Sequence, residues 1–233
     1  MPGADPRAMS HSWLFTGPPG SGRSLAAIDF AAALMCTDPE EPGCGRCEAC
    51  RAVLDTKQHT DLVLVDPQEV IIPVDTVREV IGRAASLPTV APWRVVIFNN
   101  ADRLNNNGAN ALLKTVEEPP ARTVIIMCAP SDAPEDFSQT LRSRCRHLYI
   151  PSPSVESITA QLVSEGASDH DAHLAALTSL RHVGRARRLV NDPAVQKRRA
   201  VAINLAEEVF HGSQGFQAVT SLLKLVDSEA KAV

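Results

Sequence analysis

A glycine-rich segment lies between an apolar run at residues 13–16 and helix-forming residues at 24–36, and its composition is that of a phosphate-binding loop. Its functional positions are, in order, Gly17, Gly20, Gly22, Arg23 and Ser24. Such a strand, loop and helix direct backbone N–H groups at one anion, and the hydroxyl of Ser24 would bind magnesium. At the position where such loops normally have lysine, this chain has Arg23, whose bulky planar guanidinium fits the space of a lysine ammonium poorly. The pattern predicts a degenerate nucleotide site with weak or absent ATP binding; a glycine turn without a ligand is the alternative.

Two amides follow the apolar run at residues 94–98, at the place where a nucleotide hydrolase has two acids. In such an enzyme an aspartate holds Mg²⁺ and the next glutamate polarises the attacking water. Asn99 and Asn100 have a similar shape but no charge and no useful basicity. If Asn99 and Asn100 do not occupy the positions of the two acids, the other candidate for the acid is Asp66, which follows another apolar run and has no acidic neighbour. The amide pair predicts little or no ATP hydrolysis by the chain alone.

Four of the six cysteines lie close together, at Cys36, Cys44, Cys47 and Cys50. Four thiolates surround Zn²⁺ tetrahedrally, and the two-residue spacings let successive cysteines face one ion. Since sulfur fills every position, no ligand site is left for a substrate water, and we expect a structural zinc ion, not a catalytic one. The cluster predicts a zinc-binding insertion at about residues 36–50, after the first helix; a redox centre or a chance clustering of cysteines is the alternative.

The composition is that of a mildly acidic chain without a membrane segment. Its 233 residues have a formal net charge of −4 and a pI near 6.0. This balance disfavours tight, autonomous DNA binding, although it is compatible with a local basic patch. The sequence has neither a run of about eighteen apolar residues nor the apolar core of a secretory signal, so we expect a cytoplasmic protein. The length allows one large α/β domain and a smaller helical one.

Apolar runs alternate with helical patterns up to residue 150, and only helical patterns follow. Continuous apolar runs are typical of parallel strands covered on both faces, and they occur at residues 62–65, 94–98 and 124–128. A short buried strand is expected at residues 13–16 and a last strand at residues 147–150. The intervening helices are expected at residues 24–36, 74–86 and 108–118, the last one capped by Asp102 and stopped by Pro119. Beyond a linker at residues 151–153, helices are expected at residues 155–164, 170–180, 184–191, 194–211 and 216–226. This order predicts an α/β fold with a parallel five-stranded sheet, followed by a small α-helical domain.

Three features together resemble one family, the bacterial clamp-loader subunits, which have an AAA+-type fold. These features are the segment Asn110–Pro120, the cysteine cluster after the phosphate-loop helix, and the segment Leu141–Cys145. Within that family the altered phosphate loop and the missing acids are similar to the delta-prime subunits of DNA polymerase III, not to the ATPase gamma/tau subunits. The resemblance implies an AAA+-like P-loop α/β domain at residues 1–150, a helical lid at 151–195 and the start of a collar-like region at 196–233.

The resemblance also implies roles for two arginines. Arg144 would be an arginine finger that acts in trans, reaching the ATP of a neighbouring subunit and stabilising charge on its γ-phosphate. Without the resemblance, an arginine paired with a carboxylate near the fifth strand is the simpler interpretation. Arg187 matches the lid arginine that senses the γ-phosphate, and the arginine-rich run around it is equally compatible with a solvated face. Ala129 and Pro130 replace the polar residue expected after the fourth strand, so another γ-phosphate contact is missing.

The implied function is that of a non-catalytic clamp-loader subunit within the DNA polymerase III holoenzyme. Its partners would be the gamma/tau and delta subunits and, through the complex, the sliding clamp and primer–template DNA, with no membrane partner. Two alternatives stay open: an active ATPase of the gamma/tau kind, and a zinc-stabilised interaction module without a finger. Because few residues precede Trp13 and most of the collar region is missing, we expect the chain to be truncated at both ends.

Overall fold

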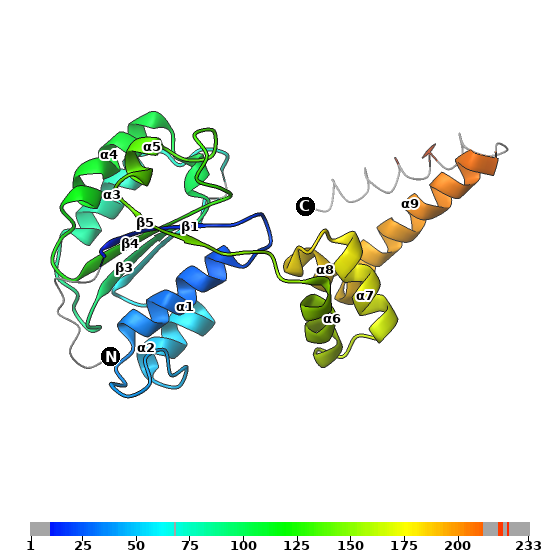
Figure 1. Cartoon of the computed structure of the whole chain (residues 1–233), viewed down its shortest axis with the longest axis horizontal. Coiled ribbons are helices and arrows are strands. Elements are labelled where there is room, and N and C mark those ends of the chain that lie inside the picture. Colours follow the sequence, from blue (N-terminus) through cyan, green and yellow to red (C-terminus); the bar gives the residue numbers. More distant parts are fainter. Residues whose placement is uncertain (1–9, 68, 212–218, 221–222, 224–233) are drawn as a thin grey trace. The chain divides into compact units, whose positions relative to one another are not determined.

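The computed structural model describes residues 10–67, 69–211, 219–220 and 223. The chain divides into two compact units, Met1–Ser152 and Pro153–Val233 (Figure 1). Within the described ranges, no helix is both long enough and apolar enough to cross a membrane.

A five-stranded parallel sheet forms the centre of the first unit, as the apolar runs predict. Its strands are β1 (Ser12–Thr16), β2 (Leu62–Val65), β3 (Arg94–Phe98), β4 (Thr123–Ala129) and β5 (Arg146–Tyr149). They lie in the order β2-β3-β4-β1-β5, and each neighbouring pair is parallel. Thr16, the last residue of β1, pairs with Ala129 on one side and Tyr149 on the other. The carboxyl ends of these three strands therefore meet beside the segment that follows β1.

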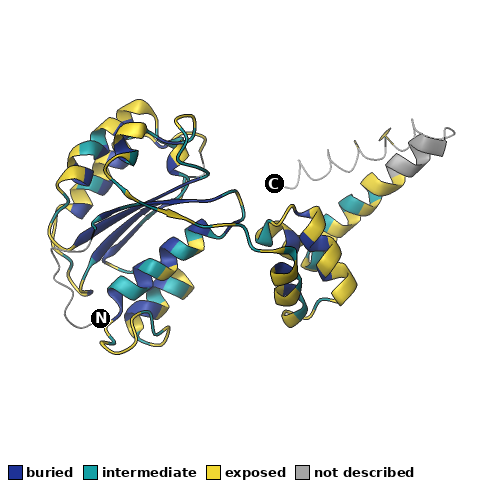
Figure 2. Ribbon diagram, in the orientation of Figure 1, coloured by how far each residue is buried: buried dark blue, intermediate teal, exposed yellow. Residues whose placement is uncertain are grey.

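Helices cover both faces of the sheet, which explains why its central strands β3 and β4 are buried along their whole length and mostly apolar. The main ones are α1 (Arg23–Met35), α3 (Val74–Ala84) and α4 (Asn106–Glu117). In β3, Val95 and Ile97 belong to the core cluster that contains α1, whereas Val96 and Phe98 belong to the cluster that contains α3 and α4. Figure 2 shows the strands buried between the two layers. The alternation follows from the two-residue period of a strand.

Short helical segments complete the first unit. They are α2 (Glu48–Arg51), a π-helical turn (Ala52–Thr56), a 3₁₀ turn (Ala101–Arg103) and α5 (Gln139–Arg142). The expected cap of α4 is wrong: Asp102 lies within the 3₁₀ turn, and Asn105 instead accepts a hydrogen bond from the backbone N–H of Gly108 at 2.9 Å. The extra turn between β3 and α4 decides which of the nearby polar side chains reaches the helix.

A buried ion pair, which the sequence pattern did not indicate, joins the residue before β2 to the first residue of β3. Nη2 of Arg94 donates to Oδ1 of Asp61 at 2.9 Å, and the two side chains are 7% and 0% exposed. The carboxylate also accepts the backbone N–H groups of Thr89, Val90 and Ala91. Burial opposes ionisation, but these donors and Arg94 hold the pKa of Asp61 well below its ordinary value. The pair therefore fixes the segment that leads into β3.

Helices make up the described part of the second unit. They are α6 (Val155–Ser164), α7 (Asp169–Thr178), α8 (Val183–Asn191) and α9 (Pro193–His211), close to the helices that the sequence predicts. A small core holds the first three together, formed by Ile158, Leu162, Ala172, Ala175, Ala176 and Ala186. The expected boundary between lid and collar-like region, after residue 195, falls inside α9. Most of the helix expected at residues 216–226 lies outside the described residues.

Candidate functional site

The predicted phosphate-loop segment lies between the end of β1 and the start of α1. Gly20 and Gly22 have φ values of 86° and 92°, in the left-handed region that glycine adopts without strain. Gly17 is constrained differently, because a Cβ there would collide with the carbonyl oxygen of Ile150 after β5. Gly22 is the N-cap of α1 and provides no capping side chain, so the first N–H groups of the helix stay available to a ligand. The strand, loop and helix occur in the predicted order, and Ser24 lies in the first turn of α1.

Arg23 is buried and lies against its own loop. Its Nη1 donates to the carbonyl oxygen of Gly17 at 2.7 Å, and its Nη2 donates to Oδ1 of Asn100 at 3.4 Å. No carboxylate in the described part of the chain lies within ion-pair distance of this guanidinium. Its Nε is buried without a hydrogen-bond partner, as are Oγ of Ser21 and Oδ1 of Asn99. The loop therefore contains a buried positive charge that forms no ion pair with an acid among the described residues.

The two amides lie at the end of β3, as their position after the apolar run at residues 94–98 predicts. Asn99 donates its backbone N–H to the carbonyl oxygen of Val65 at 2.8 Å, which continues the pairing of β3 with β2. Asn100 has a left-handed backbone, with φ of 52° and ψ of 53°, and its side-chain oxygen meets Arg23. Asp66 follows the neighbouring strand β2. Because the groups at the end of β3 are neutral, they provide neither a charged magnesium ligand nor a base.

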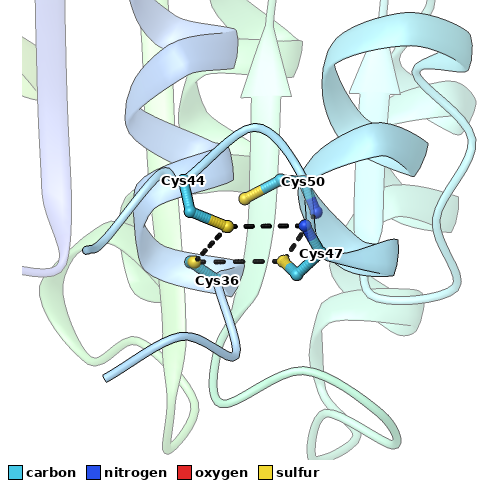
Figure 3. A group of neighbouring side chains, drawn as sticks. All are labelled: Cys36, Cys44, Cys47 and Cys50. Carbon is cyan, nitrogen blue, oxygen red and sulfur yellow. Dashed lines mark hydrogen bonds between the residues drawn. The ribbon is translucent and has the colours of Figure 1, made fainter. Parts of the chain in front are cut away.

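Four cysteine thiols converge in the segment between α1 and α2 (Figure 3). Cys36 follows α1, Cys44 lies in the connecting loop, and Cys47 caps α2, which contains Cys50. Their Sγ atoms all lie within 4.8 Å of one another, and Sγ of Cys36 is 3.7 Å from that of Cys44 and 3.9 Å from that of Cys47. Zinc with tetrahedral Zn–S distances of about 2.3 Å requires S···S separations of about 3.8 Å. The four free thiols therefore fit one metal ion.

Backbone N–H groups favour the thiolate form in part of this cluster. They lower the pKa of Cys47 to about 6, with the largest contribution from Thr37. Burial raises the pKa of Cys36, but backbone donors led by Cys44 outweigh burial and leave that pKa below its ordinary value. Burial raises the pKa of Cys50 to about 12. A bound cation would supply the charge that ionises Cys50, because a coordinating thiol is deprotonated outright.

Arg144 lies on the surface between α5 and β5, where it pairs with a carboxylate. Its Nε donates to Oε1 of Glu117, the last residue of α4, which is 27 residues earlier in the chain. Its Nη1 donates to the carbonyl oxygen of Thr140 at 2.8 Å and to Oγ of Ser143 at 3.2 Å. The side chains of Arg144 and Glu117 are 36% and 46% exposed. The carboxylate pairing that the sequence left open for this arginine is therefore present.

Arg187 is also paired, within the second unit. Its Nε and Nη2 donate to the two carboxylate oxygens of Glu165 at 2.8 Å and 2.6 Å, a bidentate contact between α8 and the residue after α6. The Arg187 guanidinium lowers the pKa of Glu165. The contact joins two of the helices that surround the small core of this unit.

The structure thus groups the predicted residues in separate places. The loop, Arg23 and the two amides meet at the carboxyl edge of the sheet, and the four cysteines meet after α1. Arg144 contacts α4 and α5, not the loop. The sequence reasoning missed Glu117 and Glu165, because no local spacing indicates a partner that is distant along the chain. Glu117 does lie within the segment Asn110–Pro120, on which the family resemblance depends.

The sequence is similar to known replication proteins. A profile of the family described as "DNA polymerase III, delta subunit" matches residues 4–154. The chain is 35% identical over 165 residues to the DNA polymerase III subunit delta′ of Pseudomonas aeruginosa, a match that covers 68% of this chain and 49% of that protein. It is 34% identical over 170 residues to the delta′ subunit of Escherichia coli, with 72% and 50% covered. It is also 33% identical over 174 residues to the gamma/tau subunit of Mycobacterium tuberculosis, with 72% and 30% covered.

The chain spans about half the length of these delta′ relatives. Its fold is similar to a DNA polymerase III gamma subunit-related protein of Thermotoga maritima, with a TM-score of 0.58, 18% identity, and 96% of this chain and 74% of that chain covered. The RuvB Holliday junction branch migration motor of the same organism gives a TM-score of 0.50 at 16% identity, with 86% and 58% covered. These structures support the AAA+-type fold alone. Because the family profile matches residues 4–154, which is more than half of the sequence, the chain belongs to the DNA polymerase III delta-subunit family, within which it is similar to the delta′ subunits.

Proposed function

We propose that this chain is a clamp-loader subunit of the delta′ kind that hydrolyses little or no ATP itself. The proposal depends on the surroundings of Arg23, whose guanidinium donates hydrogen bonds to the carbonyl oxygen of Gly17 and to the neutral amide of Asn100. Without a charged ligand Mg²⁺ binds weakly, and without a carboxylate no group accepts a proton from the attacking water. The contribution of the chain to ATP-driven loading of the sliding clamp is then structural and regulatory.

In this proposal Arg144 acts in trans on ATP held by a neighbouring gamma/tau subunit. The side chain lies on the surface, partly exposed, beside the fully buried Leu141 of α5. A guanidinium in such a position stabilises the charge that develops on a transferring phosphoryl group. The other partners are the delta subunit and, through the assembled complex, the sliding clamp and primer–template DNA. A structural zinc ion on the four cysteines stabilises the insertion after α1, and replication places the chain in the cytoplasm.

An active ATPase of the gamma/tau kind is the second candidate. The unpartnered buried atoms at the loop, Nε of Arg23 and Oγ of Ser21, favour it because they offer donors to a phosphate oxygen. The 33% identity to the gamma/tau subunit of Mycobacterium tuberculosis favours it as well. What separates the candidates is the chemistry at Asn99 and Asn100, since an ATPase needs an acid in that place.

The test measures ATP hydrolysis by the chain alone and by a clamp loader reconstituted with gamma/tau and delta subunits. We expect no magnesium-dependent turnover from the chain alone. In the complex, Arg144→Ala should co-elute normally and lower hydrolysis at the adjacent site by about a thousandfold. Arg142→Ala, two residues away and paired with its own carboxylate on Asp132, is the matched control and should hydrolyse at the parent rate.

Other results would contradict the proposal. Magnesium-dependent turnover by the chain alone, abolished by Arg23→Ala, would identify an ATPase. If the complex with Arg144→Ala forms normally and hydrolyses ATP at the parent rate, the chain would instead be a zinc-stabilised interaction module without an arginine finger. Failure of the parent chain to co-elute with the other subunits would contradict its role as a subunit.

A further inference from the structure

Arg144 is held by its own chain through two of its three guanidinium nitrogens. Nε donates to Glu117, and Nη1 donates to the carbonyl oxygen of Thr140 at 2.8 Å and to Oγ of Ser143 at 3.2 Å. No residue that the structure describes accepts a hydrogen bond from Nη2. Nη2 is therefore the guanidinium nitrogen that has no hydrogen-bond acceptor in this part of the chain.

The backbone on both sides of this contact is anchored in the core. Leu141 is fully buried, and Cys145 packs partly buried against the same core cluster. The backbone N–H of Arg144 donates to the carbonyl oxygen of Leu141 at 3.0 Å. Glu117 is the last residue of α4, whose inner face belongs to that cluster too. A surface arginine is thus supported by elements that burial holds in place.

We propose that Glu117 is a positioning residue for Arg144, holding its Nε so that Nη2 is presented to a phosphoryl oxygen of the neighbouring subunit. The inference rests on the proposed function, in which Arg144 acts on ATP in trans. The two side chains are 36% and 46% exposed, so their pairing contributes little to folding stability. The pairing instead restricts the rotation of the Arg144 side chain. A mobile arginine loses rotamer entropy when it binds a phosphate, and Glu117 removes part of that loss beforehand.

A carboxylate that sequesters the arginine would act in the opposite direction. Glu117 accepts its hydrogen bond from Nε, so a phosphoryl oxygen can bind Nη2 without breaking the hydrogen bond between Glu117 and Arg144. Positioning therefore predicts slower hydrolysis when Glu117 is removed, whereas sequestration predicts faster hydrolysis.

The first test uses the reconstituted clamp loader and compares Glu117 variants with Arg144→Ala. Because other subunits also hydrolyse ATP, the rate of interest is the part of the total that Arg144→Ala removes. We expect Glu117→Ala to lower kcat for that part by about tenfold to a hundredfold, with KM for ATP little changed. Glu117→Gln keeps an acceptor oxygen and should restore most of the rate. Glu118→Ala removes an exposed neighbouring side chain that forms no hydrogen bond or ion pair with Arg144, and it should match the parent.

The outcomes separate this inference from the proposed function. If Arg144→Ala is slow but Glu117→Ala is as fast as the parent, or faster, the positioning role is overturned and the finger stands. If Arg144→Ala leaves hydrolysis unchanged, the proposed function fails, and the positioning role fails with it.

A second readout needs no partner subunit. In nitrogen-15 spectra of the chain alone, the Nε–Hε signal of Arg144 can be assigned from its loss in Arg144→Lys. We expect this proton to exchange with water several-fold faster in Glu117→Ala than in the parent or in Glu118→Ala. Equal exchange in Glu117→Ala and the parent would overturn the inference whatever the ATPase rates are.

Discussion

At the scale of single residues, the surroundings of Arg23 favour phosphate binding but not magnesium binding, two properties that a phosphate loop normally combines. Its charge is buried at the first residue of α1, next to the positive end of the helix dipole, with no carboxylate paired to it in the described part of the chain. These surroundings attract anions. Asn99 and Asn100, however, are neutral, so they provide no charged ligand for Mg²⁺ at the end of β3. Attraction for phosphate and the ability to use magnesium should therefore be separable here.

The first prediction concerns magnesium. In the parent chain, any ATP binding should be weak and the same with and without Mg²⁺. The triple variant Arg23→Lys, Asn99→Asp, Asn100→Glu should bind ATP at least about tenfold tighter with Mg²⁺ than without, a difference of about 1.4 kcal/mol. Titration with a fluorescent ATP analogue measures both Kd values. Arg23→Lys alone is the control and should show no magnesium effect; a magnesium-dependent Kd in the parent would contradict the prediction.

At the scale of elements, charge as well as backbone pairing joins the edge strand β2 to the rest of the sheet. Arg94, at the start of β3, binds Asp61 before β2. It also donates to the carbonyl oxygens of Arg83 and Ser86, at the end of α3, at 2.7 Å and 2.8 Å. One buried guanidinium therefore ties a helix end and the start of two strands together.

Removing the acid of this pair should destabilise the first unit strongly. Asp61→Ala leaves the Arg94 charge buried and unpaired, and we expect a loss of about 3–5 kcal/mol in the free energy of unfolding, measured with denaturant. Asp75→Ala, which breaks an exposed pair with Arg78, should cost less than about 1 kcal/mol. Similar losses in the two variants would contradict the structural role of Asp61.

The contribution of Asp61 to the free energy of unfolding depends on pH in a defined direction. Folding lowers the pKa of Asp61, so the stabilisation is fully present above its unfolded value of about 3.9 and is lost as pH falls below that value, through the folded pKa. The stability difference between the parent and Asp61→Ala should therefore stay constant from neutral pH down to about pH 5 and shrink in stronger acid. A difference that shrinks already between pH 7 and pH 5 would contradict this assignment.

The insertion after α1 makes a separate prediction. The purified chain should contain about one zinc ion, and a chelator should remove it and lower the Tm of the first unit, since a structural zinc contributes folding free energy. Cys47→Ser should lose the metal. Cys145→Ser, which changes a half-buried cysteine outside the cluster, should keep it. Metal analysis of the three proteins decides the matter, and a parent chain without stoichiometric zinc would contradict the prediction.

At the scale of the whole molecule, the chain has two units with separate cores. The core of the first unit surrounds the sheet, and that of the second consists of Ile158, Leu162 and a group of alanines. The contact between Arg187 and Glu165 belongs to the second unit alone. Interactions within one unit should therefore affect the unfolding of that unit only.

Calorimetry should resolve this independence as two unfolding transitions. We expect Glu165→Ala to shift the transition of the second unit by an amount that corresponds to at most about 1 kcal/mol, because the pair is partly exposed. Removal of zinc should shift only the other transition. If one treatment moves both transitions together, the two units do not unfold independently.

Much of the fold could be predicted because its causes are local. Strands buried on both faces read as continuous apolar runs, so β1 to β4 are predicted to within one residue at each end. The cysteine cluster was equally readable, since its ligands are close in the sequence. The cap of α4 was not, because Asp102 and Asn105 are both capable of capping and only the path of the chain after β3 selects one of them.

The sequence by itself therefore determined the order of the elements, the loop with its altered residues and the position of the thiols, because each depends on neighbours along the chain. Tertiary structure alone decided which distant groups meet. Glu117 reaches Arg144 because α4 ends beside α5, and Asn100 reaches Arg23 because β3 ends near the loop. Such contacts depend on strand order and helix packing, which bring together residues that no short-range pattern relates.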